Sequence, residues 1–274
     1  MKTAARYKAV WELMTAVFAD RQPADNITNA YFRERRFIVA GDRRFIAEKI
    51  WHIIRRRRRL TFEAGSADPR KLLIAYLKDE DPAEIFAGGE YGLPPLNDDE
   101  RKLAAALRTE ERTYPPAVEC ECPDWLFAKI GDPLLLKALN EPAGADFRVC
   151  RGSREEVLRL LENEGFEAVP TPYSPLGIRL PTRINLSNCM AYQDGLIEVQ
   201  DEASQLAALM CGIRPEDRII DYCSGAGGKA LALAAQLKGQ GVIEAHDINP
   251  QRLEQLKPRL ARLCIGNVKI VPSA

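Results

Sequence analysis

The chain of 274 residues is 46% hydrophobic and 28% charged, with 39 basic and 39 acidic residues. This balance suits one large globular domain or two to three small ones, and it excludes a collagen-like, coiled-coil or wholly disordered protein. No stretch approaches the roughly 18 uninterrupted apolar residues of a membrane span, the N-terminus has no signal-peptide core, and seven scattered cysteines do not resemble a disulfide framework. We therefore expect a cytoplasmic protein with reduced thiols and no membrane partner.

The neutral total is divided unevenly along the chain. Residues 1–60 carry 15 Lys or Arg against 6 Asp or Glu, a net charge of +9, whereas residues 61–146 carry 9 against 18, a net charge of −9. Residues 147–274 balance at 15 and 15. A basic N-terminal segment of this kind indicates contact with RNA or DNA.

Two apolar patterns predict helices in the basic segment. The first places five side chains on one helical face: Val10, Leu13, Met14, Val17 and Phe18. The second follows Asp42, a candidate N-cap, with the same kind of spacing: Phe45, Ile46, Ile50, Ile53 and Ile54.

The second helix is predicted to run into five consecutive arginines: Arg55, Arg56, Arg57, Arg58 and Arg59. Successive positions advance about 100° around a helix, so these side chains cannot all meet one partner. A solvated helix end and contact of part of the cluster with RNA phosphates both stay open.

Turn signals accumulate between residues 61 and 124, and a proline pair at 115–116 marks an expected domain boundary. Asn97 is a candidate N-cap of a helix inside this segment. Cys120 and Cys122 form a C-x-C pair, but no second Cys or His pair follows at zinc spacing. We therefore predict no metal site.

From about residue 146 the pattern becomes mixed α/β. A strand over 147–149, a capping box of Ser153 and Glu156, a helix that stops at Gly165, and strands near 166–169 and 177–180 predict a small β-α-β layer. The pattern is compatible with RNA binding and with a purely structural bridge.

The C-terminal segment predicts strands and helices in alternation. A helix over 202–210 precedes a strand at 218–222, a loop, and a helix that ends near residue 238. A strand over 242–245, a helix near 251–263 and a strand over 268–271 follow. This β-α-β-α-β order is half of a doubly wound nucleotide-binding sheet.

The loop after the first of these strands consists of Cys223, Ser224, Gly225, Ala226, Gly227, Gly228 and Lys229. Its glycines let a ligand approach the backbone beside the unpaired amides of a helix N-terminus. The loop is shorter than phosphate-binding patterns, and Ala230 replaces the magnesium-binding hydroxyl. S-adenosyl-L-methionine (SAM) has no phosphate, and Asp247 suits its two ribose hydroxyls. A tight turn with Asp247 as a helix cap is the structural alternative.

Two motifs carry a resemblance to a known family. The sequence EVQDEASQ over residues 198–205, followed by DYCSGAGGK over 221–229, looks like the RsmB/NOP/Sun family of RNA cytosine-5 methyltransferases. Weaker similarity extends upstream: Pro123-x-Trp125-Leu126 and residues 147–149 match the family's RNA-binding N1 region, and residues 41–55 resemble a NusB-like helical domain.

The resemblance implies an α/β protein in three parts. Residues 1–115 would form an all-α NusB-like RNA-binding domain, residues 116–190 a small α/β N1-type RNA-binding region, and residues 191–274 the first half of a Rossmann-like class I methyltransferase sheet. The loop over 223–229 would bind SAM and Asp247 its ribose, while the arginines at 55–59 and Arg148 would contact RNA. The implied role is rRNA processing, with ribosomal RNA as the partner.

Three departures from the family pattern stand out. Ala230 replaces a usual Thr, and Cys150 replaces a usual Asn. The third concerns the two catalytic cysteines, which lie in Pro-Cys and Thr-Cys motifs on the fourth and fifth strands of family members, where one thiolate attacks the cytosine ring. The 274 residues contain neither motif, so the resemblance places the family nucleophile beyond Ala274 and no catalytic residue within this sequence.

These departures predict a chain that does not turn over alone. Cys223 belongs to the cofactor loop, and the other six cysteines are expected to be small buried hydrophobes. The strand with Ile219 and Ile220 would become an unpaired apolar edge. We therefore expect an N-terminal fragment, a truncated gene product or one part of a split enzyme with a C-terminal complementing half, monomeric when complete. A non-catalytic RNA-binding protein, or a methyltransferase for a small molecule or protein, is the alternative.

Overall fold

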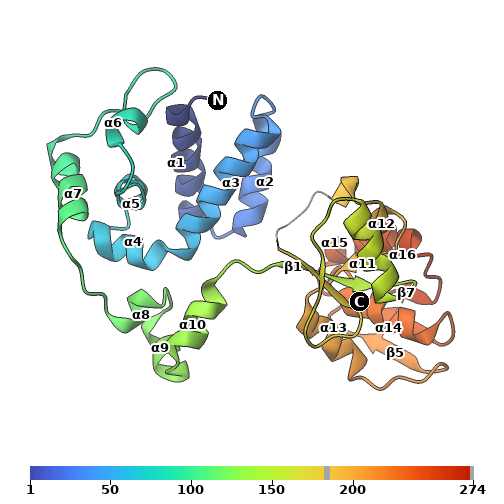
Figure 1. Ribbon diagram of the computed structural model, residues 1–274. Coiled ribbons are helices and arrows are strands. Elements are labelled where there is room, and N and C mark those ends of the chain that lie inside the picture. The colour runs from blue at the N-terminus through green and yellow to red at the C-terminus, as the bar shows by residue number, and fades with distance from the viewer. Residues whose placement is uncertain (182–185, 272–274) are drawn as a thin grey trace. The chain divides into compact units, whose positions relative to one another are not determined.

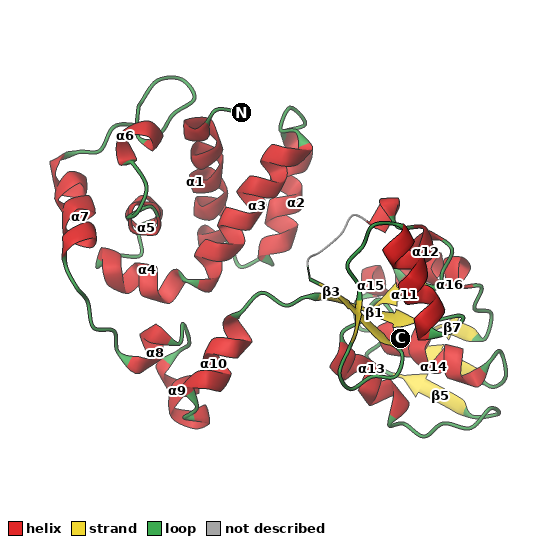
Figure 2. Ribbon diagram, viewed as in Figure 1, coloured by secondary structure: helices red, strands yellow, loops and turns green. Residues whose placement is uncertain are grey.

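The computed structural model describes residues 1–181 and 186–271, and the contacts within it divide the chain into two compact units, 1–141 and 142–274. Figure 2 shows helices alone in the first unit and both helices and strands in the second. The division into three regions with boundaries at 115 and 190 stays a prediction. Ala274, beyond which the family nucleophile is expected, lies outside the described residues, so that expectation also stays a prediction.

The first unit consists of helices of unequal length (Figure 1). In chain order they are α1 Thr3–Ala19, α2 Ala24–Glu34, α3 Ala40–Arg55, α4 Arg57–Ala64, α5 Pro69–Tyr76, α6 Pro82–Ile85, α7 Asp98–Thr109, α8 Pro116–Glu119, α9 Asp124–Ile130 and α10 Pro133–Asn140.

The main core of this unit is built from the two predicted apolar faces. Val10 and Leu13 of α1 and Ile46 and Ile50 of α3 are fully buried, and α1 packs against α3. The prediction of Asp42 as an N-cap is wrong, because the N-cap of α3 is Val39, three residues earlier. The Asp42 carboxylate instead accepts a hydrogen bond of 2.6 Å from Arg6 Nε, so a partner distant in sequence uses it.

The short helices α8, α9 and α10 enclose a small core of their own, made of Ala117, Cys120, Cys122 and Leu136. Helix α8 packs against α4 of the larger helical group. The predicted Asn97 cap is confirmed: its side chain accepts from the Glu100 amide at 2.9 Å, and Glu100 accepts from the Asn97 amide in return.

The second unit contains two sheets. Its elements are β1 Ala145–Val149, α11 Arg154–Asn163, β2 Val169–Pro170, β3 Gly177–Leu180, the 3-10 helix η1 Leu186–Asn188, α12 Met190–Gln193, β4 Ile197–Val199, α13 Glu202–Leu209, β5 Arg218–Asp221, α14 Gly228–Leu237, β6 Val242–Ala245, α15 Pro250–Glu254, α16 Leu256–Leu263 and β7 Val268–Ile270.

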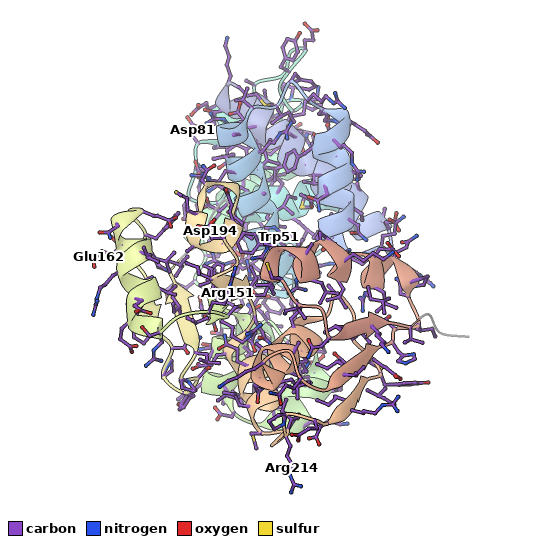
Figure 3. The ribbon with its side chains drawn as sticks, turned by 90° about the vertical axis from the view of Figure 1, so that its right-hand side faces the viewer. Trp51, Asp81, Arg151, Glu162, Asp194 and Arg214 are labelled. Atoms are coloured by element: carbon purple, nitrogen blue, oxygen red, sulfur yellow. The ribbon has the colours of Figure 1, made fainter. Side chains whose placement is uncertain are left out.

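The first sheet is antiparallel, with strand order β2-β3-β1-β4. The capping box of Ser153 and Glu156 is confirmed at the start of α11. The strand expected at 166–169 is instead a two-residue pair at 169–170. The loop after β1 and the loop before β4 are tied together, because Arg151 donates to the Asp194 carbonyl; both residues are labelled in Figure 3.

The second sheet is parallel, with strand order β5-β6-β7, and confirms the three predicted strands. The predicted helix over 251–263 is divided at Gln255 into α15 and α16. Within residues 1–181 and 186–271, β5 has a strand on one side only. Ile220 on β5 is 64% exposed, as expected for an open edge, whereas Ile219 packs partly into the core.

The cysteines bear out the prediction only in part. All seven are free thiols, and Cys120, Cys122 and Cys189 are buried. Cys211 and Cys264 are exposed, so the prediction that they are buried hydrophobes is wrong; both lie at helix ends, where the chain turns toward solvent. The described part of the chain contains no cluster of metal-ligating side chains and no helix that is long and apolar enough to cross a bilayer.

Candidate functional site

The glycine loop lies where β5 ends and α14 begins. Gly227 is the N-cap of α14 with φ at +84°, a left-handed conformation that favours glycine. A Cβ on Gly227 would lie 2.3 Å from Leu256 Cδ1, whereas a Cβ on Gly228 would meet no atom within 4 Å. Gly227 is therefore required by the fold, and Gly228 leaves open space at the start of the helix.

Asp247 follows β6 and holds the loop from the neighbouring strand. Its two carboxylate oxygens each accept a backbone amide at 2.8 Å, one from Gly225 and one from Asn249. Both hydrogen bonds lower the pKa of Asp247 below its usual range; the bond from the Asn249 amide has the larger effect and that from the Gly225 amide the next. The carboxylate is therefore ionised at neutral pH, and an ionised carboxylate can accept about four hydrogen bonds in all.

A cavity of about 250 Å³ opens beside this loop at the carboxyl end of β5. Its lining combines the loop, the segment after β4 and one side chain of α16: Val199, Gln200, Asp201, Ser204, Asp221, Cys223, Ser224, Gly228, Lys229 and Arg259. The carboxyl ends of strands are where open α/β sheets bind their ligands. A second cavity of about 580 Å³ shares Val199 and Asp201 with this one.

Two buried oxygens of this lining have no hydrogen-bond partner among the residues described: Asp221 Oδ2 and Ser224 Oγ. A buried polar atom without a partner costs free energy, so such atoms are rare unless a ligand or water completes them. Asp221 ends β5 and Ser224 follows it in the turn, so both atoms belong to one corner of the cavity. This corner suits a ligand that donates hydrogen bonds.

The segment over 198–205 connects the antiparallel sheet to the loop. Gln200 is 6% exposed; its Oε1 accepts from Arg148 Nε at 2.8 Å, and its Nε2 donates to the Gly228 carbonyl at 3.2 Å. Gln205 Nε2 donates to the Gln200 carbonyl at 2.8 Å. Gln200 is thus a link between the buried Arg148 of β1 and the first residue of α14.

A second link runs from β4 to the loop through α16. Arg259 donates to the Ala226 carbonyl, and its Nη2 lies 3.1 Å from Glu198 Oε1. The Glu198 side chain is 2% exposed and also pairs with Arg262. Two guanidinium groups therefore neutralise this buried carboxylate, and one of them holds the glycine loop in place.

Replacement of Gln200 by Leu tests the first link. The change leaves the buried Arg148 guanidinium without its acceptor, so we expect the free energy of unfolding to fall by about 2–4 kcal/mol. Urea denaturation of the variant measures the effect, with Gln240→Leu at an exposed position as the control. A Gln200→Leu variant as stable as the Gln240→Leu control would contradict this role.

Of the residues expected to bind the cofactor, four line the cavity: Cys223, Ser224, Gly228 and Lys229. The other four do not line it but hold the loop in its conformation: Gly225 donates to Asp247, the Ala226 carbonyl accepts from Arg259, and Gly227 lies against Leu256. Six further residues line the cavity that were not predicted as site residues from the sequence: Val199, Gln200, Asp201, Ser204, Asp221 and Arg259. The first four belong to the EVQDEASQ motif, which marked the segment without giving it a role. Arg259 has no recognisable local motif, because it reaches the loop from α16, a helix distant in sequence.

The arginines at 55–59 do not lie on one helix. Helix α3 ends at Arg55, and Arg56 is the junction residue before α4. Arg57 lies 4.2 Å from the centre of the Phe18 ring. The side chains of Arg55 and Arg56 form no hydrogen bond or ion pair within the described parts of the chain.

The last two arginines of the run have acidic partners. Arg58 Nη2 lies 2.5 Å from Asp124 Oδ1, and the Arg59 amide donates to Glu121 Oε2 at 3.1 Å. Both partners belong to the segment of α8 and α9, so this part of the run joins that segment to α4. Contact of part of the run at 55–59 with RNA phosphates stays a prediction, and the acidic partners of Arg58 and Arg59 compete with it.

Arg148 is also placed within the fold. It is 2% exposed on β1, and its Nη2 atom has no partner among the described residues. A contact with RNA would require this guanidinium to become accessible. The prediction that Arg148 binds RNA stays untested.

These features define a class of protein. A parallel β-α-β-α-β unit, a glycine loop without a phosphate-binding pattern, and an acidic residue after the second strand together form the first half of a class I methyltransferase sheet.

Comparison with known proteins agrees with a methyltransferase sheet and indicates a particular methyltransferase family. Residues 208–273 match the family model described as 16S rRNA methyltransferase RsmB/F. The resemblance to the RsmB/NOP/Sun family is thereby confirmed for this segment of the chain. A ribosomal RNA small subunit methyltransferase B from Proteus mirabilis is 31% identical over 149 residues, which are 52% of this chain and 35% of the relative. Its counterpart from Pseudomonas syringae pv. tomato is 35% identical over 113 residues, 40% of this chain and 25% of the relative.

Solved structures share the fold. The crystal structure of PH0851 matches with a TM-score of 0.71 at 18% identity, and the match covers 99% of this chain and 70% of that one. NSun6 from Pyrococcus horikoshii, solved with SFG, matches with a TM-score of 0.51 at 18% identity over 55% of this chain and 64% of its own. The predicted fold class is confirmed, and the chain spans about a third of the length of the first curated relatives it matches.

Proposed function

We propose that this chain carries the SAM-binding half of an rRNA cytosine-5 methyltransferase. The observation that carries the proposal is the cavity at the end of β5, where Asp221 Oδ2 and Ser224 Oγ are buried without partners among the described residues, beside the open space at Gly228. The match of residues 208–273 to the family model described as 16S rRNA methyltransferase RsmB/F supports the choice of SAM and of rRNA. The curated relatives are named as methyltransferases of the small-subunit ribosomal RNA.

The residues present fit SAM. The Asp221 carboxylate suits the ammonium group of the methionine part, the amides at the start of α14 suit its carboxylate, and Asp247 suits the ribose hydroxyls. The cavity is slightly smaller than the roughly 300 Å³ at which small-molecule sites begin. It therefore holds part of the cofactor, and the rest would lie over the open ends of β5 and β6. SAM supplies an activated methyl group on its sulfonium.

We further propose that methyl transfer requires residues beyond Ala274. No Pro-Cys or Thr-Cys motif is present in the 274 residues, and the β5 edge with Ile220 is open within the described ranges. A complementing half that pairs with β5 would cover this edge and supply the nucleophilic cysteine. The larger cavity next to the SAM site suits the acceptor nucleotide.

One experiment with SAM labelled in its methyl group tests both statements. The chain is incubated with labelled SAM and an rRNA transcript, and the label is followed in the protein-bound and RNA fractions. We expect reversible binding of label to the chain and no transfer to RNA above background. Transfer to cytosine would overturn the second statement, and absence of binding to a folded chain would overturn the first.

A further inference from the structure

The turn between α2 and α3 in the helical unit differs from the rest of the basic surface. Its centre, Ile38, is 1% exposed and anchors the turn in the core, whereas the flanking Phe37 and Val39 are 73% and 64% exposed. Burial of Ile38 therefore fixes the backbone and turns an aromatic ring toward water. A ring in this position has no structural task in the helical core.

Arginines lie on both sides of Phe37 in the sequence, at the end of α2, in the turn itself and in the second turn of α3. Arg33, Arg36 and Arg44 are exposed, and none of their three side chains has an ion pair or hydrogen bond within residues 1–181 and 186–271. We name Arg33, Arg36, Phe37 and Arg44 the arginine-aromatic turn. The arginines of the run at 55–59 differ, because Arg58 and Arg59 already have acidic partners.

Acidic groups near the turn are already paired. Asp42 is 2% exposed and bound by Arg6 and the chain's amino terminus, and the exposed Glu34 lies 3.4 Å from Arg35. In addition, the N-cap residue Val39 offers no side-chain acceptor to the amides of the first turn of α3. Unpaired charge in this segment is therefore contributed by the arginines.

We propose that the arginine-aromatic turn binds single-stranded RNA, with the arginines on phosphates and a base stacked on Phe37. Unpaired cations in the same turn segment as an exposed aromatic ring are the combination that sequence-tolerant single-strand binding uses. A membrane surface would require a broader apolar face than Phe37 and Val39 provide. The choice of RNA as the partner rests on the proposed function, whereas the site itself is independent of the SAM cavity.

Fluorescence anisotropy of a labelled single-stranded RNA of about 12 nucleotides, titrated with the whole chain, tests the proposal. We expect Phe37→Ala to weaken binding about fivefold or more without changing the salt dependence, because stacking carries no charge. The triple change Arg33→Gln, Arg36→Gln and Arg44→Gln should reduce the slope of log affinity against log salt by about 2, roughly 0.7 for each phosphate contact.

Matched controls separate this site from general charge. Tyr91→Ala removes another exposed aromatic ring, of 68% exposure. Arg159→Gln, Arg214→Gln and Lys269→Gln together remove three exposed cations of the second unit, among them Arg214, which extends into solvent in Figure 3. Arg55→Gln with Arg56→Gln reports on the arginine run.

The proposal is overturned if Phe37→Ala behaves like Tyr91→Ala and the triple variant like its control, or if the loss follows Arg55 and Arg56 instead. It is also overturned if Phe37→Ala abolishes binding to phosphatidylserine vesicles and leaves RNA affinity unchanged. SAM binding by the same variants should equal that of the unchanged chain. A chain that binds RNA at this turn but no SAM would contradict the proposed function alone.

Discussion

Replacement of Asp247 by Asn should weaken SAM binding roughly 100-fold, about tenfold for each charged hydrogen bond lost. The amide group keeps one acceptor oxygen and puts a donor where the carboxylate accepts from Gly225 or Asn249. Asp217→Asn is the matched control, because Asp217 also accepts a backbone amide, from Arg214 at 2.7 Å, but lies at the other end of β5. Titration calorimetry of both variants measures the difference.

The pH dependence of this group follows from its lowered pKa. A carboxyl group with a folded-state pKa below the unfolded value of about 3.9 stabilises the fold above that value and loses this contribution as the pH falls through the folded pKa. Between about pH 5 and 8 Asp247 stays ionised, so its part in SAM binding should be constant. Affinity that falls across this range in the unchanged chain, and not in Asp247→Asn, would contradict the assignment.

Replacement of Gly227 by Ala should lower the free energy of unfolding by about 3 kcal/mol. The added Cβ would lie 2.3 Å from Leu256 Cδ1, and the residue has a φ of +84° that costs L-residues energy. Gly228→Ala is the matched control in the next position, where no atom lies within 4 Å and alanine favours the helix. Its stability should equal or slightly exceed that of the unchanged chain, as measured by thermal and urea unfolding. Equal losses in both variants would show that the loop conformation is not the cause.

Local signals predicted much of the fold. The capping boxes at Asn97 and Ser153 depend on residues three positions apart, and the strands of the parallel sheet on short runs of β-branched residues, so both are visible in the sequence. The prediction of Asp42 as an N-cap was wrong because α3 begins before it, after Val39, and the Asp42 carboxylate accepts a hydrogen bond from Arg6, 36 residues away. The prediction that the five arginines continue one helix was wrong, because α3 ends at Arg55 and a new helix, α4, begins at Arg57.

The candidate site shows the same division. The loop at 223–229 was recognisable because glycine, strand and helix follow one another along the chain. The second wall of the cavity, from Val199 to Ser204, was recognisable only as a family motif without a role. Gln200 acquires its role through contacts with Arg148 and Gly228, which are 52 and 28 residues away. Such contacts depend on tertiary packing and have no local pattern.

The most direct test of the central claim is a calorimetric titration of SAM into the 274-residue chain beside its Gly228→Val variant. A valine side chain at this position enters the open space beside the cavity and meets no protein atom at its Cβ. We predict one SAM site in the unchanged chain, and its loss in a variant that unfolds at the same temperature. No binding by the folded chain, or equal binding by both proteins, would contradict a SAM site at the end of β5.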